Sequence, residues 1–304
     1  MNKIKKTQWM LALFFIGLAS IPLNGQTTLL SYNVKHGFEG DSLTINRFRN
    51  WITQQVKPDV ILYQEMNGFT KAKLRSLAKS YGHNYIAILN KESGLSPTHP
   101  LAITANRPIE QIEYKIEDMW HGYLLAKVNN LYIMVTHMAP FTLENRQKDV
   151  STILKRIEKL PSESQILVAG DFNALARSDS ARYGEKLLKS MMKLEGRLEP
   201  KSGTEIVKYR TIYRNNLNDG KLDYSVTDAM IAGGLYDAFH EFNKSFKHTA
   251  PIKSNFTKNS TPRRIDYIWI NKALLPKISS IDIVQNEYTE NISDHYPLLM
   301  QIKK

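Results

Sequence analysis

The chain has 304 residues, of which 42% are hydrophobic and 23% are charged. This composition is typical of a globular protein with a large core and excludes collagen-like, coiled-coil and wholly disordered chains. It contains no cysteine, which excludes disulfides, thiolate zinc sites, thiol nucleophiles and a lipid-modified N-terminal cysteine. The formal net charge of +12 is compatible with a polyanionic substrate such as nucleic acid or with an anionic lipid surface.

The N-terminus has the order of a secretory signal peptide. Lys3, Lys5 and Lys6 precede an apolar run from Trp9 to Ala19 and a softer stretch that ends near Gly25. The run is too short to span a bilayer, although a membrane anchor or a buried N-terminal helix is an alternative. We therefore expect residues 1–25 to be removed on export to the periplasm or out of the cell. Cleavage would remove three positive charges and no acid, so the net charge would be +12 − 3 = +9, and no stable membrane insertion is expected afterwards.

Apolar or alternating runs rich in Val, Ile, Tyr and Leu predict β-strands along residues 26–304. They are Thr28–Val34, Asp59–Glu65, Tyr85–Leu89, Leu101–Ala105, Tyr123–Val128, Leu131–His137, Gln165–Ala169, Ile265–Ile270, Ile278–Val284 and Tyr296–Ile302. The pair Asn129-Asn130 lies between two of these runs at the spacing of a two-residue turn. This predicts a hairpin, and therefore at least one antiparallel pair of strands.

Apolar residues at helical spacing lie between the strands, at 45–52, 74–78, 150–160 and 187–192. Mixed sheets with interspersed amphipathic helices predict an α/β fold whose helices cover the outer faces of the sheets. No internal repeat or shift of composition divides residues 26–304, so we expect a single domain. The segment from Gly196 to Pro262 is rich in Asn, Asp and Gly, which predicts long loops there.

Several predicted strands end in a polar residue where the apolar run stops. These residues are Asn33, Glu65, His137, Asp171 and Asn173. A single strand-terminal Asn, Asp or His is equally explained by a cap, a turn or a structural hydrogen bond. Their repetition instead indicates side chains that converge at one edge of a sheet, where ligands bind.

Asp266 lies within an apolar strand, and the pair Asp294-His295 opens the last predicted strand. A carboxylate buried in such a strand requires a charged partner, a metal ion or hydrogen-bond donors. Because neighbouring residues of a strand point to opposite faces, we expect Asp266, rather than Asp294, to contact the ring of His295.

The order of these segments resembles the endonuclease/exonuclease/phosphatase superfamily, which contains pancreatic-type deoxyribonucleases, abasic-site endonucleases, neutral sphingomyelinases and inositol-polyphosphate phosphatases. The segments are Asn33, Gln64-Glu65, Thr136-His137, Gly170-Asp171-Phe172-Asn173, Arg264-Ile265-Asp266-Tyr267 and Ser293-Asp294-His295. The resemblance runs from Thr28 to Ile302. It implies a four-layered α/β sandwich of two mixed sheets flanked by helices, with one active site at the rim of the sheets. It also implies a requirement for Mg²⁺, with Mn²⁺ or Ca²⁺ as alternatives.

The resemblance also implies roles for the polar residues. Glu65 is the principal Mg²⁺ ligand, Asn33 holds the ion or its water, and Asp294 faces the metal or another ligand. His295 takes a proton from the attacking water, with Asp266 orienting its ring.

The remaining catalytic roles fall on Asp171, Asn173 and His137. Asp171 and Asn173, on the same face if the strand continues, address the water and a phosphate oxygen. His137 donates to the phosphate or protonates the leaving group. The superfamily commonly has a different sequence around the position of His99. His99 is therefore either an extra phosphate contact or a plain loop histidine.

The sequence therefore predicts an exported, monomeric, Mg²⁺-dependent phosphodiesterase that uses an activated water, with nucleic acid as the expected substrate. A lipid or small-molecule phosphoester is the alternative substrate. A noncatalytic binding module that keeps the fold is a second alternative.

Overall fold

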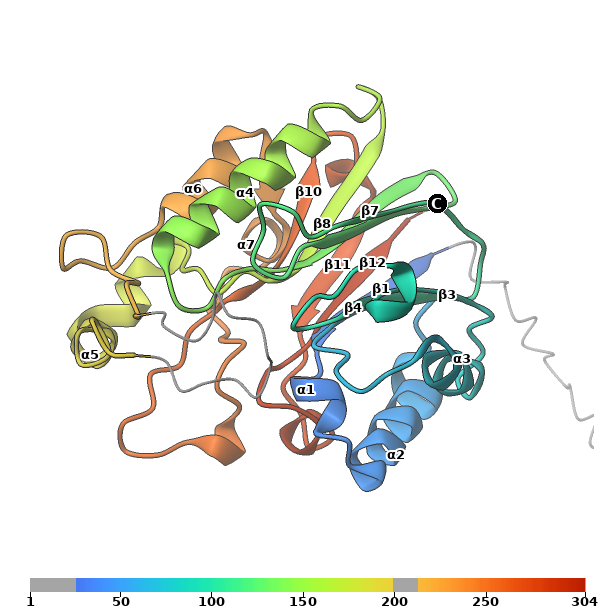
Figure 1. Cartoon of the computed structure of the whole chain (residues 1–304), viewed down its shortest axis with the longest axis horizontal. Coiled ribbons are helices and arrows are strands. Elements are labelled where there is room, and N and C mark those ends of the chain that lie inside the picture. Colours follow the sequence, from blue (N-terminus) through green and yellow to red (C-terminus); the bar gives the residue numbers. More distant parts are fainter. Residues whose placement is uncertain (1–25, 199–212, 304) are drawn as a thin grey trace, which may run out of the picture.

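The structure is a computed structural model that describes residues 26–198 and 213–303 (Figure 1). The expected signal peptide, residues 1–25, lies outside the described residues. Among the helices that are described, none has the length and apolar character needed to cross a membrane.

Two six-stranded sheets form the centre of the described part of the molecule. In spatial order, the first sheet contains β11 (Ile278–Ile283), β12 (Leu298–Ile302), β1 (Thr27–Asn33), β2 (Val60–Gln64), β4 (Leu101–Ala105) and β3 (Tyr85–Leu89). The second contains β5 (Ile109–Lys115), β6 (Tyr123–Val128), β7 (Leu131–His137), β8 (Gln165–Asp171), β10 (Asp266–Asn271) and β9 (Leu235–Asp237). The pairs β1–β2 and β7–β8 are parallel and the others are antiparallel, so both sheets are mixed.

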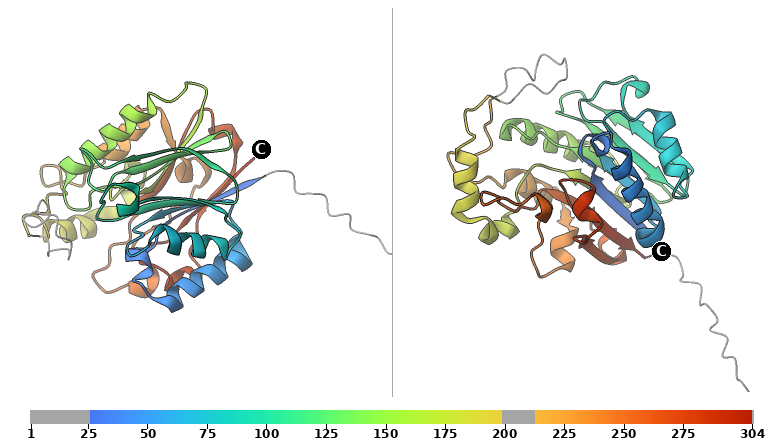
Figure 2. Two further views of the ribbon diagram at one scale, coloured as in Figure 1. Left: turned by 45° about the vertical axis from the view of Figure 1, so that its right-hand side comes forward. Right: turned by 90° about the horizontal axis from the view of Figure 1, so that it is seen from below.

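Helices cover the outer face of each sheet. The described helices are α1 (Lys35–Phe38), α2 (Ser42–Trp51), α3 (Lys71–Lys79), α4 (Leu143–Ile157), α5 (Ser180–Met192), α6 (Ser225–Ala232) and α7 (Ala238–Phe242). A π-helical turn follows α2 (Ile52–Val56), and short 3₁₀ turns span Lys91–Ser93, Arg177–Asp179, Lys253–Asn255, Leu275–Lys277 and Thr289–Asn291. Figure 2 shows α2 and α3 below the first sheet and α4 above the second.

Hydrophobic side chains fill three interfaces between these four layers. Leu29, Leu62 and Val135 belong to the core between the two sheets. Phe48 and Trp51 of α2 pack on the outer face of the first sheet. A third cluster packs α4 and α6 on the outer face of the second sheet. The predicted four-layered α/β sandwich is confirmed.

All the predicted strands are present, with ends shifted by up to two residues. The predicted hairpin is also present, because β6 pairs antiparallel with β7 and Asn129 adopts a φ of 55° in the turn. Two further strands, β5 and β9, were not predicted. A bulge between Glu110 and Glu113 breaks the alternation of β5, which lies at the sheet edge, and β9 has only three residues.

The expectation of long loops between Gly196 and Pro262 is wrong in part. Residues 225–242 fold into α6, β9 and α7. The helix α6 has the sequence SVTDAMIA, which is too short and too evenly apolar to give a clear helical stripe. Residues 199–212 of the predicted loop region lie outside the described residues.

Candidate active site

The predicted polar residues meet where strand ends of both sheets reach the same edge. In the register of the strands, Asn33 lies opposite Gln64, while Asp171 lies opposite both His137 and Asp266. The Nδ2 of Asn33 in the first sheet donates a 3.1 Å hydrogen bond to Oδ2 of Asp171 in the second sheet. One side chain thus ties the two sheets together at this edge.

Asp171, Asp266 and His295 form the first group, which we call the aspartate–histidine centre. Their donor atoms all lie within 4.8 Å of one another. The Nδ1 of His295 is 2.8 Å from Oδ2 of Asp266, and its Nε2 is 3.9 Å from Oδ2 of Asp171. The expected contact between Asp266 and the His295 ring is therefore present.

The segment that carries His295 is a loop rather than the start of a strand, because β12 begins only at Leu298. The alternation argument therefore rested on a wrong premise. The loop is instead held by Ser293, whose Oγ donates to the Asn33 carbonyl at 2.7 Å and accepts from the His295 N–H at 3.3 Å. This bond fixes the His295 loop to the end of β1.

Burial and charge act strongly on this centre. Burial, followed by the neighbouring carboxylate of Asp266, raises the pKa of Asp171, although His295 and His137 oppose the shift. Burial alone would lower the pKa of His295, but the carboxylates of Asp266 and Asp171 outweigh it and raise that pKa well above its usual range. These carboxylates therefore favour the protonated form of the His295 imidazole.

The segment around Asp171 depends on an unusual backbone. Gly170 has a φ of 145°, and a Cβ built there would lie 1.9 Å from the Thr136 carbonyl oxygen. Only glycine lets β8 approach β7 this closely. Beyond Asp171 the strand ends, and Asn173 turns back with a φ of 49°, donating its N–H to Oδ1 of Asp171 at 2.9 Å. The expected continuation of the strand to Asn173 is therefore wrong.

Glu65 belongs to a second group with His36 and His99, which we call the glutamate–histidine centre. Donor atoms of the three residues also lie within 4.8 Å of one another. Burial tends to raise the pKa of Glu65, but His137, His99 and hydrogen bonds from the His36 N–H and Asn33 together lower it to about 2. Glu65 is therefore ionised at neutral pH.

Asn33 lies between the two centres. Its Nδ2 also donates to Oε1 of Glu65 at 3.0 Å, while its Oδ1 accepts from the Lys35 N–H at 3.1 Å. The amide thus presents its NH₂ group, rather than its oxygen, to the carboxylates of Glu65 and Asp171. This geometry favours a positioning role over the expected role as a metal ligand. Asp294 lies beside Ser293, with 3.4 Å between its Oδ1 and the Ser293 Oγ. It belongs to neither donor cluster among the described residues.

A family model for the Endonuclease/Exonuclease/phosphatase family matches residues 30–295, which contain every residue named in the two centres. The chain belongs to this family. It is a phosphoesterase by that membership. No protein with a curated description matches the sequence as a relative.

Three solved structures illustrate the similarity of fold. The 3′ phosphatase NExo from Neisseria, bound to a product DNA hairpin, has a TM-score of 0.61 at 12% identity, covering 91% of this chain and 100% of its own. An AP endonuclease from Archaeoglobus fulgidus has a TM-score of 0.61 at 14% identity, with 90% and 98% covered. TDP2 from D. rerio, complexed with a single-strand DNA product, has a TM-score of 0.59 at 16% identity, with 92% and 100% covered. At these identities the likeness shows the shared fold.

This family member also places two histidines that the sequence patterns did not indicate, His36 and His121, beside His99 and His137. The rings of His99 and His121, and those of His121 and His137, have centroids 4.5 Å apart, and the His36 and His99 centroids are 5.2 Å apart. Burial, followed by the like charge of His137, lowers the pKa of His99 to about 4. His36 follows Asn33 by three residues, and this proximity could have marked it as a site residue. No such sequence feature marks His121.

A small cavity of about 130 Å³ adjoins the site at Asn173 and is lined by Arg146, Arg214 and Arg263. Arg146 is 4% exposed, and its Nη1 donates to the Ala139 carbonyl and to Oδ1 of Asn216. Burial lowers its pKa to about 10. Within the described residues, neither Arg146 nor Arg263 forms an ion pair. Positive charge without a bound carboxylate thus lies next to the aspartate–histidine centre.

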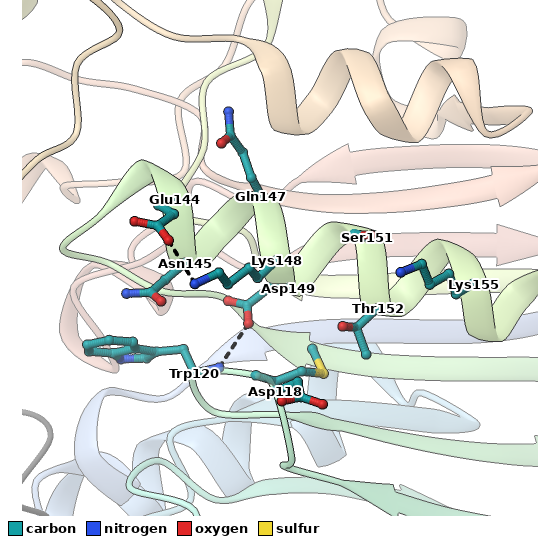
Figure 3. Close-up of a pocket in the computed structure, with 11 residues that line it drawn as sticks. Asp118, Trp120, Glu144, Asn145, Gln147, Lys148, Asp149, Ser151, Thr152 and Lys155 are labelled. Atoms are coloured by element: carbon teal, nitrogen blue, oxygen red, sulfur yellow. Dashed lines mark hydrogen bonds and ion pairs between the residues drawn. The ribbon is translucent and has the colours of Figure 1, made fainter.

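A larger surface pocket, of about 910 Å³, runs along α4 and includes no residue of either centre (Figure 3). Part of its charge is compensated within the pocket. Glu144 pairs with Lys148 at 2.8 Å, and Asp149 accepts the Trp120 N–H at 2.8 Å. Size alone therefore does not identify the active site in this family member.

Proposed function

We propose that this phosphoesterase is an exported, Mg²⁺-dependent phosphodiesterase that cleaves nucleic acid with an activated water. The observation that carries the proposal is the double hydrogen bond of Asn33, which joins ionised Glu65 to Asp171 and its partner histidine. A carboxylate for a cation and a group for proton transfer thereby lie side by side at one rim. Export is supported by the sequence of residues 1–25 alone.

The donor set fits a hard divalent cation. Such ions prefer carboxylate oxygens, and Glu65 remains ionised even though it is largely buried. Glu65 would hold the ion, and Asp294 on the adjacent loop would add a second carboxylate. When bound, the ion would neutralise charge on the non-bridging phosphate oxygens and on the leaving oxygen.

The aspartate–histidine centre supplies the proton chemistry. His295 Nε2 and Asp171 Oδ2 are 3.9 Å apart, too far for a direct hydrogen bond but suitable for one water that bonds to both. We assign the nucleophile to such a water and the removal of its proton to this pair. Asp266 holds the His295 ring through Nδ1, so that Nε2 faces the water.

His137 and Asn173 complete the catalytic group in this proposal. His137 Nε2 lies 3.5 Å from Oδ2 of Asp171, so its ring would lie beside a phosphoester that reacts at this centre. We assign to it the donation of a proton to the phosphate or leaving group. Asn173 orients Asp171 through its N–H and is positioned by its Nδ2, which donates to the Met138 carbonyl at 3.1 Å.

The choice of nucleic acid is supported by positive charge near the site. A substrate with several phosphates could place one at the reacting centre and another at the cavity lined by Arg146, Arg214 and Arg263. The expected mature charge of +9 acts in the same direction, because it concentrates polyanions near the protein.

The test is a substrate panel of duplex DNA, RNA, sphingomyelin and inositol phosphates, each with Mg²⁺ and with a chelator. We expect turnover of nucleic acid that requires Mg²⁺, and binding that weakens steeply between about 50 and 200 mM salt. Turnover of sphingomyelin or inositol phosphates alone would replace nucleic acid by the lipid or small-molecule alternative. No metal-dependent turnover of any substrate would support the binding module. Fractionation of cells that express the full chain tests export.

A further inference from the structure

The glutamate–histidine centre contains a type of ligand that the proposed Mg²⁺ chemistry does not use. We propose that His36, Glu65 and His99 form a binding site for a borderline transition-metal ion such as Co²⁺ or Zn²⁺. The donor atoms of the three side chains lie within 4.8 Å of one another, so small side-chain rotations would bring them onto a single ion. Because Glu65 is shared with the proposed Mg²⁺ site, this inference rests in part on the proposed function.

The backbone around His36 is strained, and its conformation places His36 next to Glu65. Lys35, His36, Gly37, Phe38 and Glu39 all have positive φ, between 45° and 67°, so α1 is a left-handed turn. Left-handed residues other than glycine cost roughly 1–2 kcal/mol each, and such strain persists mainly where function requires it.

The strained turn gives His36 two approaches to the same oxygen of Glu65. Its backbone N–H lies 2.9 Å and its Nδ1 lies 3.5 Å from Oε2 of Glu65. At Gly37 a Cβ would lie 2.0 Å from the Asn67 carbonyl oxygen, so the turn packs tightly against the loop that follows Glu65. The position of the His36 ring is therefore built into the fold.

His99 supplies the second imidazole and has an unused buried atom. Its Nδ1 is buried and has no hydrogen-bond partner within the described part of the chain. A buried polar atom without a partner costs about 1–3 kcal/mol, and in a native structure it calls for an explanation such as an ion. The His99 ring lies 5.2 Å from that of His36, which is compatible with two imidazoles sharing one ion.

The combination of two imidazoles and one carboxylate determines the class of ion. Imidazole nitrogen favours borderline ions such as Zn²⁺ and Co²⁺, whereas Mg²⁺, Ca²⁺ and Mn²⁺ prefer sets made of oxygen. Two histidines and one glutamate are also a known set for sites that keep an open coordination position. The His36 side chain is 59% exposed, so one side of the proposed site faces solvent and could admit water or a phosphate oxygen.

The aspartate–histidine centre offers a contrast, because each of its side chains already has a hydrogen-bond partner. The Nδ1 of His295 is bonded to Asp266, and Asp171 accepts from both Asn33 and Asn173. In the glutamate–histidine centre, the buried Nδ1 of His99 has no partner within the described residues. This difference assigns the borderline ion to the glutamate–histidine centre.

The test uses Co²⁺ as a spectroscopic probe, with the purified protein and no substrate. We expect visible absorption bands from bound Co²⁺ at about one ion per chain, since histidine-containing sites of low coordination number give such bands. The variants His36→Gln and His99→Gln should each raise the dissociation constant on the order of tenfold or more. His240→Gln removes an exposed histidine of α7 and should leave Co²⁺ binding unchanged.

Two outcomes would overturn the site. One is the absence of Co²⁺ binding to the wild-type protein, and the other is equal binding by the wild type and His36→Gln. Because His36 is exposed, its variant provides a folded comparison even where the buried His99→Gln fails to fold. The nuclease assay with Mg²⁺ is independent of these readouts. Loss of the proposed function would appear as absence of turnover with Co²⁺ binding intact, whereas failure of this inference would leave the turnover in place.

Discussion

The two centres at the rim differ in how they are built. In the aspartate–histidine centre, the side chains of Asp171 and Asp266 are 3% and 4% exposed, and they face each other because β8 and β10 pair in register. In the glutamate–histidine centre, Glu65 has a φ of 63° and His36 lies in a left-handed turn beyond the strand end. Regular sheet pairing therefore fixes the proposed proton-transfer group, while strained loops present the groups proposed to hold an ion.

The same contrast appears in hydrogen bonding. Each side chain of the aspartate–histidine centre has a hydrogen-bond partner, and the two carboxylates stabilise the protonated His295 ring. The glutamate–histidine centre includes an exposed His36 ring and a buried nitrogen of His99 that has no hydrogen-bond partner among the described residues. The first arrangement holds a geometry that is ready before substrate arrives, and the second leaves capacity for a ligand.

The largest effect should come from removing the proton-transfer group. His295→Gln should lower turnover by about 10³-fold or more, because the substituted amide cannot accept a proton from water. Turnover of a phosphodiester substrate and thermal unfolding should be measured together. His240→Gln on α7 serves as the matched control and should retain wild-type turnover. Retention of more than a few per cent of activity by His295→Gln would remove the proton-transfer role from the buried centre.

A smaller effect, with a characteristic pH signature, is expected for Asp266→Asn. The Asp266 carboxylate raises the pKa of His295, so in the wild type the neutral imidazole forms only at higher pH, and activity should rise with pH as it forms. Removing this charge lowers the pKa and should shift the rising limb of the profile of kcat/KM against pH to more acidic values. Turnover at the optimum should fall on the order of 10²-fold because the ring loses its orientation. An unshifted limb would mean that another group controls the pH dependence.

The strand pairing of the buried centre can be tested at Gly170. A Cβ at this position meets the Thr136 carbonyl oxygen at 1.9 Å and requires an unfavourable φ. Gly170→Ala should therefore reduce the free energy of unfolding by about 4 kcal/mol, as overpacking and backbone strain add. Gly82→Ala is the control, because Gly82 also has positive φ but no atom within 4 Å of the added Cβ, so it should cost about 1 kcal/mol. Equal losses in urea unfolding would show that the close approach of β8 to β7 does not matter.

The sequence could predict the buried centre because period-two patterns and strand ends locate its residues. The sheets, the layers and the proximity of Asp171 to Asp266 follow from apolar runs that end at the same rim. The contact of Asp266 with His295 was predicted through a strand that is in fact a loop. That loop is held by Ser293 through a bond to Asn33 across 260 residues of sequence, and no local pattern encodes such a bond.

The glutamate–histidine centre was harder to predict from the sequence. The left-handed turn contains Lys35, Phe38 and Glu39, none of which favours positive φ, so propensity does not predict five consecutive left-handed residues. His99 lies near Glu65 only because of the path that the chain takes between β3 and β4. The orientation of Asn33 could not be predicted either, because an amide can present its oxygen or its NH₂ group with equal ease. The hydrophobic pattern of the sequence therefore does not predict irregular backbone or the orientation of side chains.

The smallest predicted effect is the contribution of the glutamate–histidine centre to the pH dependence of the free energy of unfolding. The pKa of His99 is lowered to about 4, first by burial and then by the charge of His137, whereas a histidine in the unfolded chain has a pKa of about 6.5. Between these values the unfolded state binds a proton that the folded state does not, so the folded state loses stability as pH falls from about 6.5 towards 4. At about 1.4 kcal/mol for each pH unit, this loss reaches at most about 3 kcal/mol.

The variant His99→Gln should remove this contribution because glutamine does not titrate. Urea unfolding at several pH values between about 4.5 and 7 should show a flatter pH dependence for His99→Gln than for the wild type, with the two curves converging as pH falls. The window stays above the range in which Glu65, with its pKa of about 2, contributes most. Stability that depends on Glu65 is present above the unfolded pKa of about 4.3 and is lost only below it. Parallel curves across the window would show that His99 is equally protonated in both states, and the glutamate–histidine centre would then lack the buried neutral imidazole that sets it apart from the aspartate–histidine centre.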